Sequence, residues 1–237
     1  MLRTKLRSLT TACSAILLGT LFICAGTTQE PKQEIWLFNE VSSLGGHATK
    51  VLGHPQVIDT PIGKAIQFNG VVDALFVNVH PLAGATTWTW EMIFRPDADG
   101  KPEQRIIHLQ SVEPATGQDV ADERMLFEIR IRNGRWCLDS FATAGGQART
   151  LLNCDKTYAF GPWYRVTAVY DGKTFRNYVG DELQGEGELH IPAERPGRSS
   201  AGVRINLRDY YKGAIYEARF TPRALESSEF LKLPEQK

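Results

Sequence analysis

The sequence lacks an excess of charge of either sign, because 27 Lys and Arg residues are balanced by 27 Asp and Glu residues over 237 positions. Proteins that bind nucleic acid rely on clustered excess basic residues that displace counterions, so this balance argues against nucleic acid as a partner. The chain also contains no Gly-rich phosphate loop, no His-Glu-x-x-His zinc motif and no Gly-x-Ser-x-Gly nucleophile motif. The common sequence signatures of nucleotide-binding sites, zinc hydrolases and serine hydrolases are therefore excluded.

Long apolar runs are almost absent, and the one example, at residues 12–25, follows a short basic start. An apolar run of this length after basic residues is typical of an export signal and is too short to span a bilayer comfortably. We therefore expect an exported protein, periplasmic or extracellular, with no transmembrane span in its mature form. A lipidated Cys24 and an uncleaved N-terminal anchor are the alternatives.

The export signal also divides the chain into segments. Its removal takes three of the 27 basic residues and no acidic residue, which leaves 24 against 27 and a net charge of −3. The mature protein is therefore mildly acidic. The expected organisation is a signal peptide at 1–26, a linker at 27–33, one domain at 34–233 and a tail at 234–237.

Cysteine is scarce, with four residues in the chain, and two of them lie in the predicted export signal. The other two, Cys137 and Cys154, flank a Gly-Gly pair that is typical of a two-residue hairpin turn. If Ala144 pairs with Gln147 across that turn, counting outwards places Cys137 opposite Cys154 at a non-hydrogen-bonded position, where Cα atoms approach to about 4.5 Å. In an oxidising compartment this arrangement predicts a disulfide, and two free buried thiols are the alternative.

Helical periodicity is missing from the mature chain, whereas alternation of apolar and polar residues recurs, for example at 88–95, 127–132 and 165–170. Turn pairs such as Asn133-Gly134 follow these segments. The pattern predicts an all-β fold in which two antiparallel sheets stack as a sandwich and turn their other sides to solvent. The one helical candidate, at 224–231, is expected to form a short turn or two over the sandwich edge.

The polar sides of the predicted strands carry many charged side chains. If these sides belong to adjacent strands of one sheet, they form a patch of guanidinium groups and carboxylates beside a tyrosine ring, which suits the hydroxyls or carboxylates of a sugar. Cross-strand ion pairing on a solvated face explains the same pattern without any ligand. The candidate ligand-binding residues are Glu91, Arg95, Glu128, Arg130, Arg132, Arg165, Tyr178, Arg204 and Asn206.

Several stretches also carry a family resemblance by their order and spacing. They are Gly63-Lys-Ala-Ile-Gln-Phe-Asn-Gly70, Thr87-Trp-Thr-Trp-Glu-Met-Ile-Phe-Arg-Pro96, Trp163-Tyr-Arg-Val-Thr-Ala-Val-Tyr-Asp-Gly172 and Gly213-Ala-Ile-Tyr-Glu-Ala-Arg-Phe220. Together they resemble the concanavalin A-like lectin/glucanase domains of the laminin-G-like (LamG) jelly-roll type, over residues 35–231. The resemblance implies a two-sheet antiparallel jelly roll, and it implies a structural calcium ion for which Asp73 is the candidate ligand.

This family contains sugar-binding modules, protein-binding modules and hydrolases, so the fold does not decide the activity. The Glu-x-Asp-x-x-Glu strand signature of the related endoglucanases is absent, since the strand at Glu91 reads Glu-Met-Ile-Phe-Arg. We therefore expect a non-catalytic, lectin-like carbohydrate-binding module whose partner is a glycan or polysaccharide. The alternatives are a glycan-cleaving hydrolase that uses Glu91 or Glu128, and a protein-binding adhesion or scaffold domain.

Overall fold

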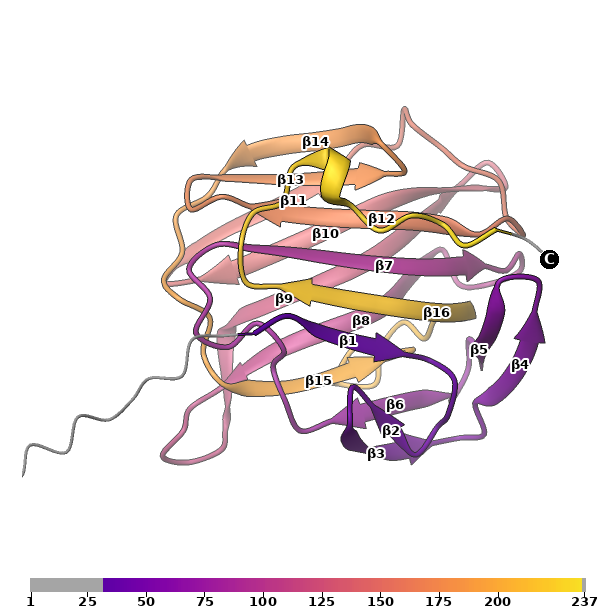
Figure 1. The fold of residues 1–237 in the computed structure, drawn as a ribbon, viewed down its shortest axis with the longest axis horizontal. Coiled ribbons are helices and arrows are strands. Elements are labelled where there is room, and N and C mark those ends of the chain that lie inside the picture. Colours follow the sequence, from indigo (N-terminus) through magenta and orange to yellow (C-terminus); the bar gives the residue numbers. More distant parts are fainter. Residues whose placement is uncertain (1–31, 236–237) are drawn as a thin grey trace, which may run out of the picture.

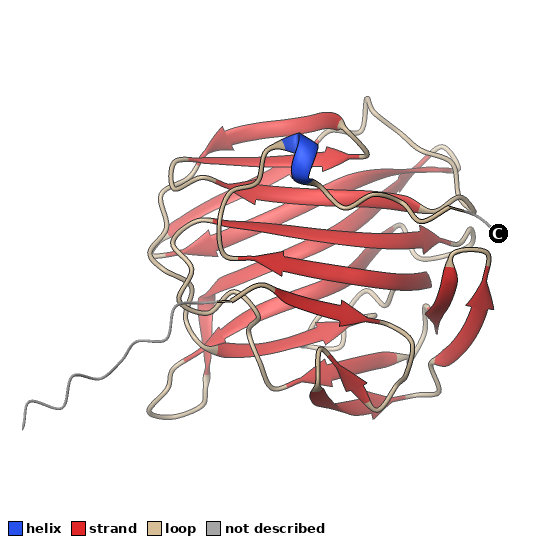
Figure 2. Ribbon diagram, in the orientation of Figure 1, coloured by secondary structure: helices blue, strands red, loops and turns tan. Residues whose placement is uncertain are grey.

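The computed structural model describes residues 32–235, which form two eight-stranded antiparallel sheets stacked as a sandwich (Figure 1). Figure 2 shows that strands make up nearly all of the regular structure. The predicted signal peptide at 1–26 and residues 27–31 of the predicted linker lie outside the described residues. The all-β sandwich predicted from the alternating pattern is confirmed.

The two sheets draw their strands from both halves of the chain. In order across the first sheet, the strands are β14 (Glu182–Glu188), β13 (Thr174–Val179), β12 (Tyr164–Tyr170), β7 (Trp88–Pro96), β16 (Lys212–Thr221), β5 (Gly63–Asn69) and β4 (Gln56–Thr60), and β1 (Glu34–Leu37) also pairs with β16. In order across the second sheet, they are β11 (Gln147–Leu152), β10 (Arg135–Ala144), β9 (Asp119–Arg132), β8 (Glu103–Val112), β15 (Gly197–Ala201), β6 (Ala74–Val77), β3 (His47–Leu52) and β2 (Ser43–Leu44).

Two tight turns set the register of the second sheet. Asn133 and Gly134 have φ angles of 51° and 70°, and Gly145 and Gly146 have φ angles of 56° and 77°. Left-handed conformations at both central residues match the twist of the flanking strands, and glycine and asparagine adopt them most readily. The strands β9, β10 and β11 therefore form a continuous meander whose pairing follows directly from the turns.

The second of these turns brings the two cysteines of the mature chain together. Ala144 pairs with Gln147 as the sequence predicts. Cys137 and Cys154 form a disulfide with a Cα–Cα distance of 5.2 Å, which lies within the usual range for such bonds. The predicted disulfide is confirmed.

The core lies between the sheets and is rich in aromatic rings. Trp90 of β7 and Phe127 of β9 meet across the sandwich with ring centroids 4.1 Å apart, and Phe94 packs edge-on against Trp136 at 5.3 Å. Phe127 and Ile129 are completely buried, as the alternation predicts. Large aromatic side chains contribute most of the buried apolar area, so these contacts hold the two sheets together.

The outer side of the first sheet is covered, contrary to the expectation that it faces solvent. The chain after β16 crosses this side and includes one 3₁₀ turn, η1 (Ser227–Glu229) (Figure 1). Leu225 and Phe230 from this segment pack on Val169 of β12. The predicted short C-terminal helix is therefore a single turn, and it packs over a sheet face rather than over the sandwich edge. Within residues 32–235, no helix is long and apolar enough to cross a membrane.

Two titratable side chains are buried at one end of the sandwich. The Trp88 indole N–H donates to Glu194 Oε1 at 3.1 Å, and His80 Nε2 lies 3.9 Å from Glu194 Oε2. Burial raises the pKa of Glu194 to about 8 and lowers the pKa of His80 to about 4. Both groups are consequently neutral in the folded protein near pH 6.

This burial predicts a loss of stability as the pH rises. Between its unfolded pKa near 4.5 and its folded pKa near 8, Glu194 holds a proton in the folded state that the unfolded state has lost. The free energy of unfolding therefore falls with pH across that window, whereas the lowered pKa of His80 acts with the opposite sign and only below pH 6.5. From pH 6.5 to 8 we expect the raised pKa of Glu194 to lower the free energy of unfolding by about 2 kcal/mol.

Urea unfolding at pH 6.5 and at pH 8 measures this loss. Glu194→Gln keeps an acceptor for Trp88 and removes the ionisable group, so the decline should shrink by about 2 kcal/mol in this variant. Glu188→Gln, at an exposed position, is the matched control and should decline as the wild type does. An undiminished decline in Glu194→Gln would show that another group carries the pH dependence.

Candidate functional site

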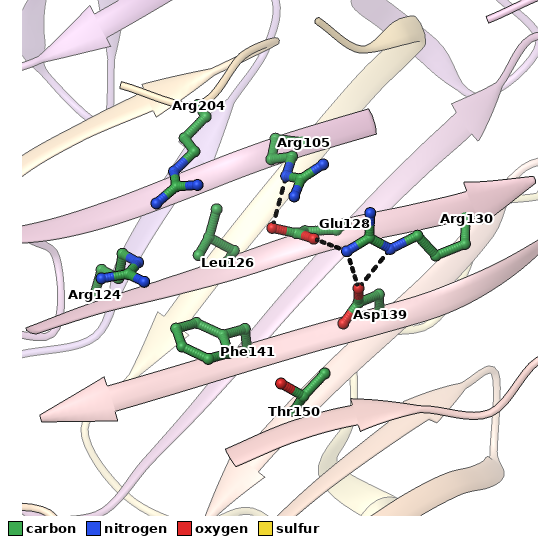
Figure 3. Close-up of a pocket in the computed structure, with 9 residues that line it drawn as sticks. All are labelled: Arg105, Arg124, Leu126, Glu128, Arg130, Asp139, Phe141, Thr150 and Arg204. Atoms are coloured by element: carbon green, nitrogen blue, oxygen red, sulfur yellow. Dashed lines mark hydrogen bonds and ion pairs between the residues drawn. The ribbon is translucent and has the colours of Figure 1, made fainter. Parts of the chain in front are cut away.

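An open pocket of about 180 Å³ lies on the outer side of the second sheet (Figure 3). Its side chains come from β8, β9, β10, β11 and the loop between β15 and β16. They combine four guanidinium groups, two carboxylates, a phenyl ring, a leucine and a threonine hydroxyl. The lining residues are Arg105, Arg124, Leu126, Glu128, Arg130, Asp139, Phe141, Thr150 and Arg204.

The strand register explains why these side chains meet. Alternate residues of β9 enter the core, so the residues between them project outwards. The turn at 133–134 sets Glu128 opposite Asp139 and Leu126 opposite Phe141. On the other side of β9, Arg105 of β8 pairs with Glu128. The local turn and the period of two therefore build most of the pocket.

One end of the pocket is a network of ion pairs. Arg130 Nε donates to Asp139 Oδ2 at 2.8 Å, and Arg130 Nη2 lies 3.1 Å from Glu128 Oε2. Arg105 Nε lies 2.9 Å from Glu128 Oε1, and Arg105 Nη1 lies 3.0 Å from Glu103 Oε2 and 2.9 Å from Asp209 Oδ2. Charge-assisted bonds of this kind hold each side chain in one orientation. We call this group the carboxylate end.

Glu128 is the most perturbed group at the carboxylate end. Burial and the neighbouring negative charge of Asp139 raise the pKa of Glu128 to about 7, and Arg105 and Arg130 oppose this rise. Both of its carboxylate oxygens are already occupied by the two arginines. Glu128 is therefore held in place, and a ligand hydroxyl would meet an acceptor of fixed position.

The opposite end of the pocket is cationic. Arg124 and Arg204 lie beside one another there, with Leu126 and Phe141 between them and the carboxylate end (Figure 3). The Arg124 guanidinium carbon lies 5.1 Å from the centroid of the Phe141 ring. Burial, together with the charges of Arg124 and Arg105, lowers the pKa of Arg204. We call Arg124 and Arg204 the arginine pair.

Hydrogen bonds to β8 hold the loop that carries Arg204. The Ile205 N–H donates to His108 Nδ1 at 3.1 Å, and the Arg105 N–H donates to the Asp209 carbonyl at 2.8 Å. Burial, and then the charge of Arg204, lower the pKa of His108 to about 3, so its imidazole is neutral and can accept this bond. Leu207 and Asp209 have φ angles of 61° and 58°. Strained residues of this kind persist where the surroundings determine the conformation.

Four predicted site residues lie on the other sheet, on its outer side. The carboxylate of Glu91 is completely buried, and its Oε1 accepts the Leu231 N–H at 2.6 Å. Arg165 Nη1 donates to the Leu231 carbonyl at 2.6 Å. Tyr178 packs edge-on against Phe230 at 5.3 Å. These three residues attach the C-terminal segment to β7, β12 and β13. The fourth residue is Arg95, and its Nε lies 3.4 Å from Asp97 Oδ1.

The predicted residues consequently do not form one patch. Glu128, Arg130 and Arg204 meet in the pocket, whereas Arg132 and Asn206 lie outside its lining. Glu91 and Glu128 belong to different sheets, so the two carboxylates of the hydrolase alternative do not face each other. The predicted single patch required all the charged strand faces to belong to one sheet, but β7, β12 and β13 belong to the first sheet and β9 belongs to the second.

The Asp73 carboxylate accepts hydrogen bonds from the backbone N–H groups of two nearby residues. Its Oδ1 accepts the His54 N–H at 2.8 Å and its Oδ2 accepts the Asn69 N–H at 3.1 Å. Among residues 32–235, no three His, Cys, Asp or Glu side chains are grouped so that they could hold a metal ion. The residues around Asp73 thus lack an acidic ligand set, and calcium binding stays a prediction from the family resemblance.

The sequence analysis missed several residues of the pocket. The sequence did contain a signal for three of them, because counting outwards from the turn at 133–134 pairs Asp139 with Glu128 and Phe141 with Leu126. Arg105 and Arg124 lie on the outward positions of β8 and β9, but their neighbours could not be identified without the order of the strands. The missed residues are Arg105, Arg124, Leu126, Asp139, Phe141 and Thr150.

The two-sheet sandwich and the sequence together place this chain in a known class of domains. Residues 69–230 match the family model described as the concanavalin A-like lectin/glucanases superfamily. The chain belongs to this family. None of the curated proteins matches the chain.

Solved structures with this fold are distant in sequence. Domain 4 of an extracellular arabinanase from Geobacillus stearothermophilus, in complex with arabinotriose, is 16% identical, with a TM-score of 0.61 over 85% of this chain and 97% of that one. The binding domain of Paraclostridial mosquitocidal protein 1 is 13% identical, with a TM-score of 0.61 over 84% of this chain. The binding domain of botulinum neurotoxin DC, in complex with SialylT, is 12% identical, with a TM-score of 0.61 over 84% of this chain. The chain covers 50% and 49% of the latter two.

Proposed function

We propose that this protein is an exported, non-catalytic carbohydrate-binding module and that the pocket on the second sheet receives the glycan. The observation that carries the proposal is the arrangement of guanidinium groups and carboxylates beside the Phe141 ring. Sugar rings offer hydroxyls to such donors and acceptors, and their C–H groups pack on aromatic rings. The arabinotriose complex of the similarly folded arabinanase domain and the Cys137–Cys154 disulfide support glycan binding and export, respectively.

Binding is favoured over cleavage by the geometry of the carboxylates. Glycoside hydrolysis needs an acid and a second carboxylate that are free to reach the scissile bond from two sides. In the pocket, Arg105 and Arg130 engage both oxygens of Glu128, and Asp139 shares Arg130 with it. Arginines therefore hold both carboxylates within the ion-pair network, and neither is free to move toward a glycosidic bond.

A glycan array probed with the mature domain tests the proposal. We expect binding to at least one glycan, and about a tenfold or greater loss in Phe141→Ala, because the aromatic contact is removed. Thr150→Trp, which fills the pocket from its exposed rim, should abolish the same binding without touching the core. Thr116→Trp, in the loop between β8 and β9, is the matched control and should bind as the wild type does.

Thermal melting of each variant separates loss of binding from loss of folding. A folded wild-type domain that binds no glycan would refute the proposal. Release of reducing sugar that disappears in Glu128→Gln would favour the hydrolase instead. A fixed protein partner retained in Thr150→Trp would favour the adhesion or scaffold domain.

A further inference from the structure

We propose that the pocket is selective for an acidic sugar, whose carboxylate or sulfate group binds between Arg124 and Arg204. This inference rests on the proposed function and specifies the class of glycan. It follows from the unequal distribution of charge within the pocket, from the way the Arg124 side chain and the loop of Arg204 are held, and from the size of the pocket.

The charges of the pocket are separated rather than mixed. Glu103, Glu128, Asp139 and Asp209 all pair with Arg105 or Arg130 at the carboxylate end. Among residues 32–235, no carboxylate lies within 4.0 Å of the guanidinium group of either member of the arginine pair. Two like charges beside each other repel, and an anion placed between them would remove that repulsion.

Arg124 and the backbone that carries Arg204 are held in place before a ligand binds. Arg124 lies over the Phe141 ring and donates through Nη1 to the Ala121 carbonyl. Its Nε is buried and has no hydrogen-bond partner among the described residues. The bonds from Ile205 to His108 and from Arg105 to Asp209 fix the loop that carries Arg204. Groups held this way lose little conformational entropy when a ligand binds.

The size and polarity of the pocket fit a single acidic sugar unit. A volume of about 180 Å³ is below the range of roughly 300–1,000 Å³ typical of sites for larger ligands. An anionic group at the arginine pair leaves the sugar ring beside Leu126 and Phe141, and the ring hydroxyls then reach the carboxylate end. A neutral sugar would make the last two contacts but would leave the arginine pair without a partner.

The test compares acidic oligosaccharides with their neutral counterparts. Oligogalacturonate, oligomannuronate and hyaluronan fragments are titrated beside their carboxyl-reduced forms, and dextran sulfate beside dextran. We expect at least one acidic probe to bind about tenfold or more tightly than its neutral counterpart. Raising NaCl from about 50 to 500 mM should weaken binding of the acidic probe more than that of the neutral one, since added salt screens charge.

Variants test whether the arginine pair is responsible for the preference for acidic sugars. Arg204→Gln and Arg124→Gln should each reduce affinity for the acidic probe by roughly 10- to 100-fold, with little change for the neutral one. Arg132→Gln removes the same charge from an exposed end of β9 outside the pocket, and it should leave both affinities unchanged. Retained preference in Arg204→Gln and Arg124→Gln, or tighter binding of the neutral probes, would overturn the inference and leave the proposed function standing. Binding of no probe here by a domain that binds a glycan on the array would overturn the inference alone, and binding neither to these probes nor on the array would overturn both.

Discussion

Arg130→Met is expected to lower the free energy of unfolding by about 3 kcal/mol at pH 8, the largest effect of any single change in the pocket. Arg130 joins Glu103, Glu128 and Asp139, and the side chains of the last two are only 6% and 2% exposed. Methionine keeps most of the side-chain length but leaves these two carboxylates facing each other with one arginine nearby. Removing one partner of a buried ion pair costs far more than the pair itself contributes.

Urea unfolding followed by tryptophan fluorescence measures this loss. The loss should shrink at pH 5, because Glu128, whose pKa is already raised to about 7, is then protonated and no longer repels Asp139. The double variant Arg130→Met/Asp139→Asn should recover part of the stability. Arg132→Met, at an exposed position on the same strand, is the control and should change stability by less than about 0.5 kcal/mol. Equal stability of Arg130→Met and the wild type would show that the network contributes nothing.

The double variant Cys137→Ser/Cys154→Ser is expected to unfold about 3 kcal/mol more easily than the wild type. The disulfide closes a loop across a sequence separation of 17 residues, and it restricts the unfolded chain. Cys137 also pairs with Arg130 across β9 and β10, so the bond secures the hairpin that carries the carboxylate end.

The same measurement on the wild type with dithiothreitol provides the control. Chemical reduction and the serine double variant should both lower the urea midpoint, because both remove the cross-link. A midpoint that does not change on reduction would show that the hairpin holds its register without the bond. Glycan affinity measured on the folded serine variant then reports whether the bond also positions the pocket.

Local patterns predicted the strands that form the floor of the pocket. Phe127 and Ile129 are buried because a strand turns alternate side chains to opposite sides, and this depends only on neighbours in sequence. The Asn133-Gly134 and Gly145-Gly146 pairs predicted two tight turns, since few other residues adopt left-handed conformations at low cost. From those turns, the pairing of Cys137 with Cys154 followed by counting.

The position of the other charged residues could not be predicted in this way. Glu91 and Glu128 have the same local pattern, an acidic residue on the polar side of an alternating strand. One is completely buried beneath Leu231 and the other lines an open pocket. The difference comes from the C-terminal segment, which crosses one outer sheet side and leaves the other open, and no periodicity within either strand reflects that.

The amino-acid sequence alone determined the all-β fold, the tight hairpins and the disulfide of this protein, because each follows from steric preferences and side-chain alternation over a few residues. Only the tertiary structure decided which charged side chains meet beyond a single hairpin. Arg105 and Arg124 come from consecutive strands and Arg204 from a distant loop after β15, and they reach one pocket because β8 pairs with both β9 and β15. Strand order depends on the packing free energy of the whole sandwich, which no local sequence pattern reports. That order places the arginine pair and the carboxylates at opposite ends of the pocket.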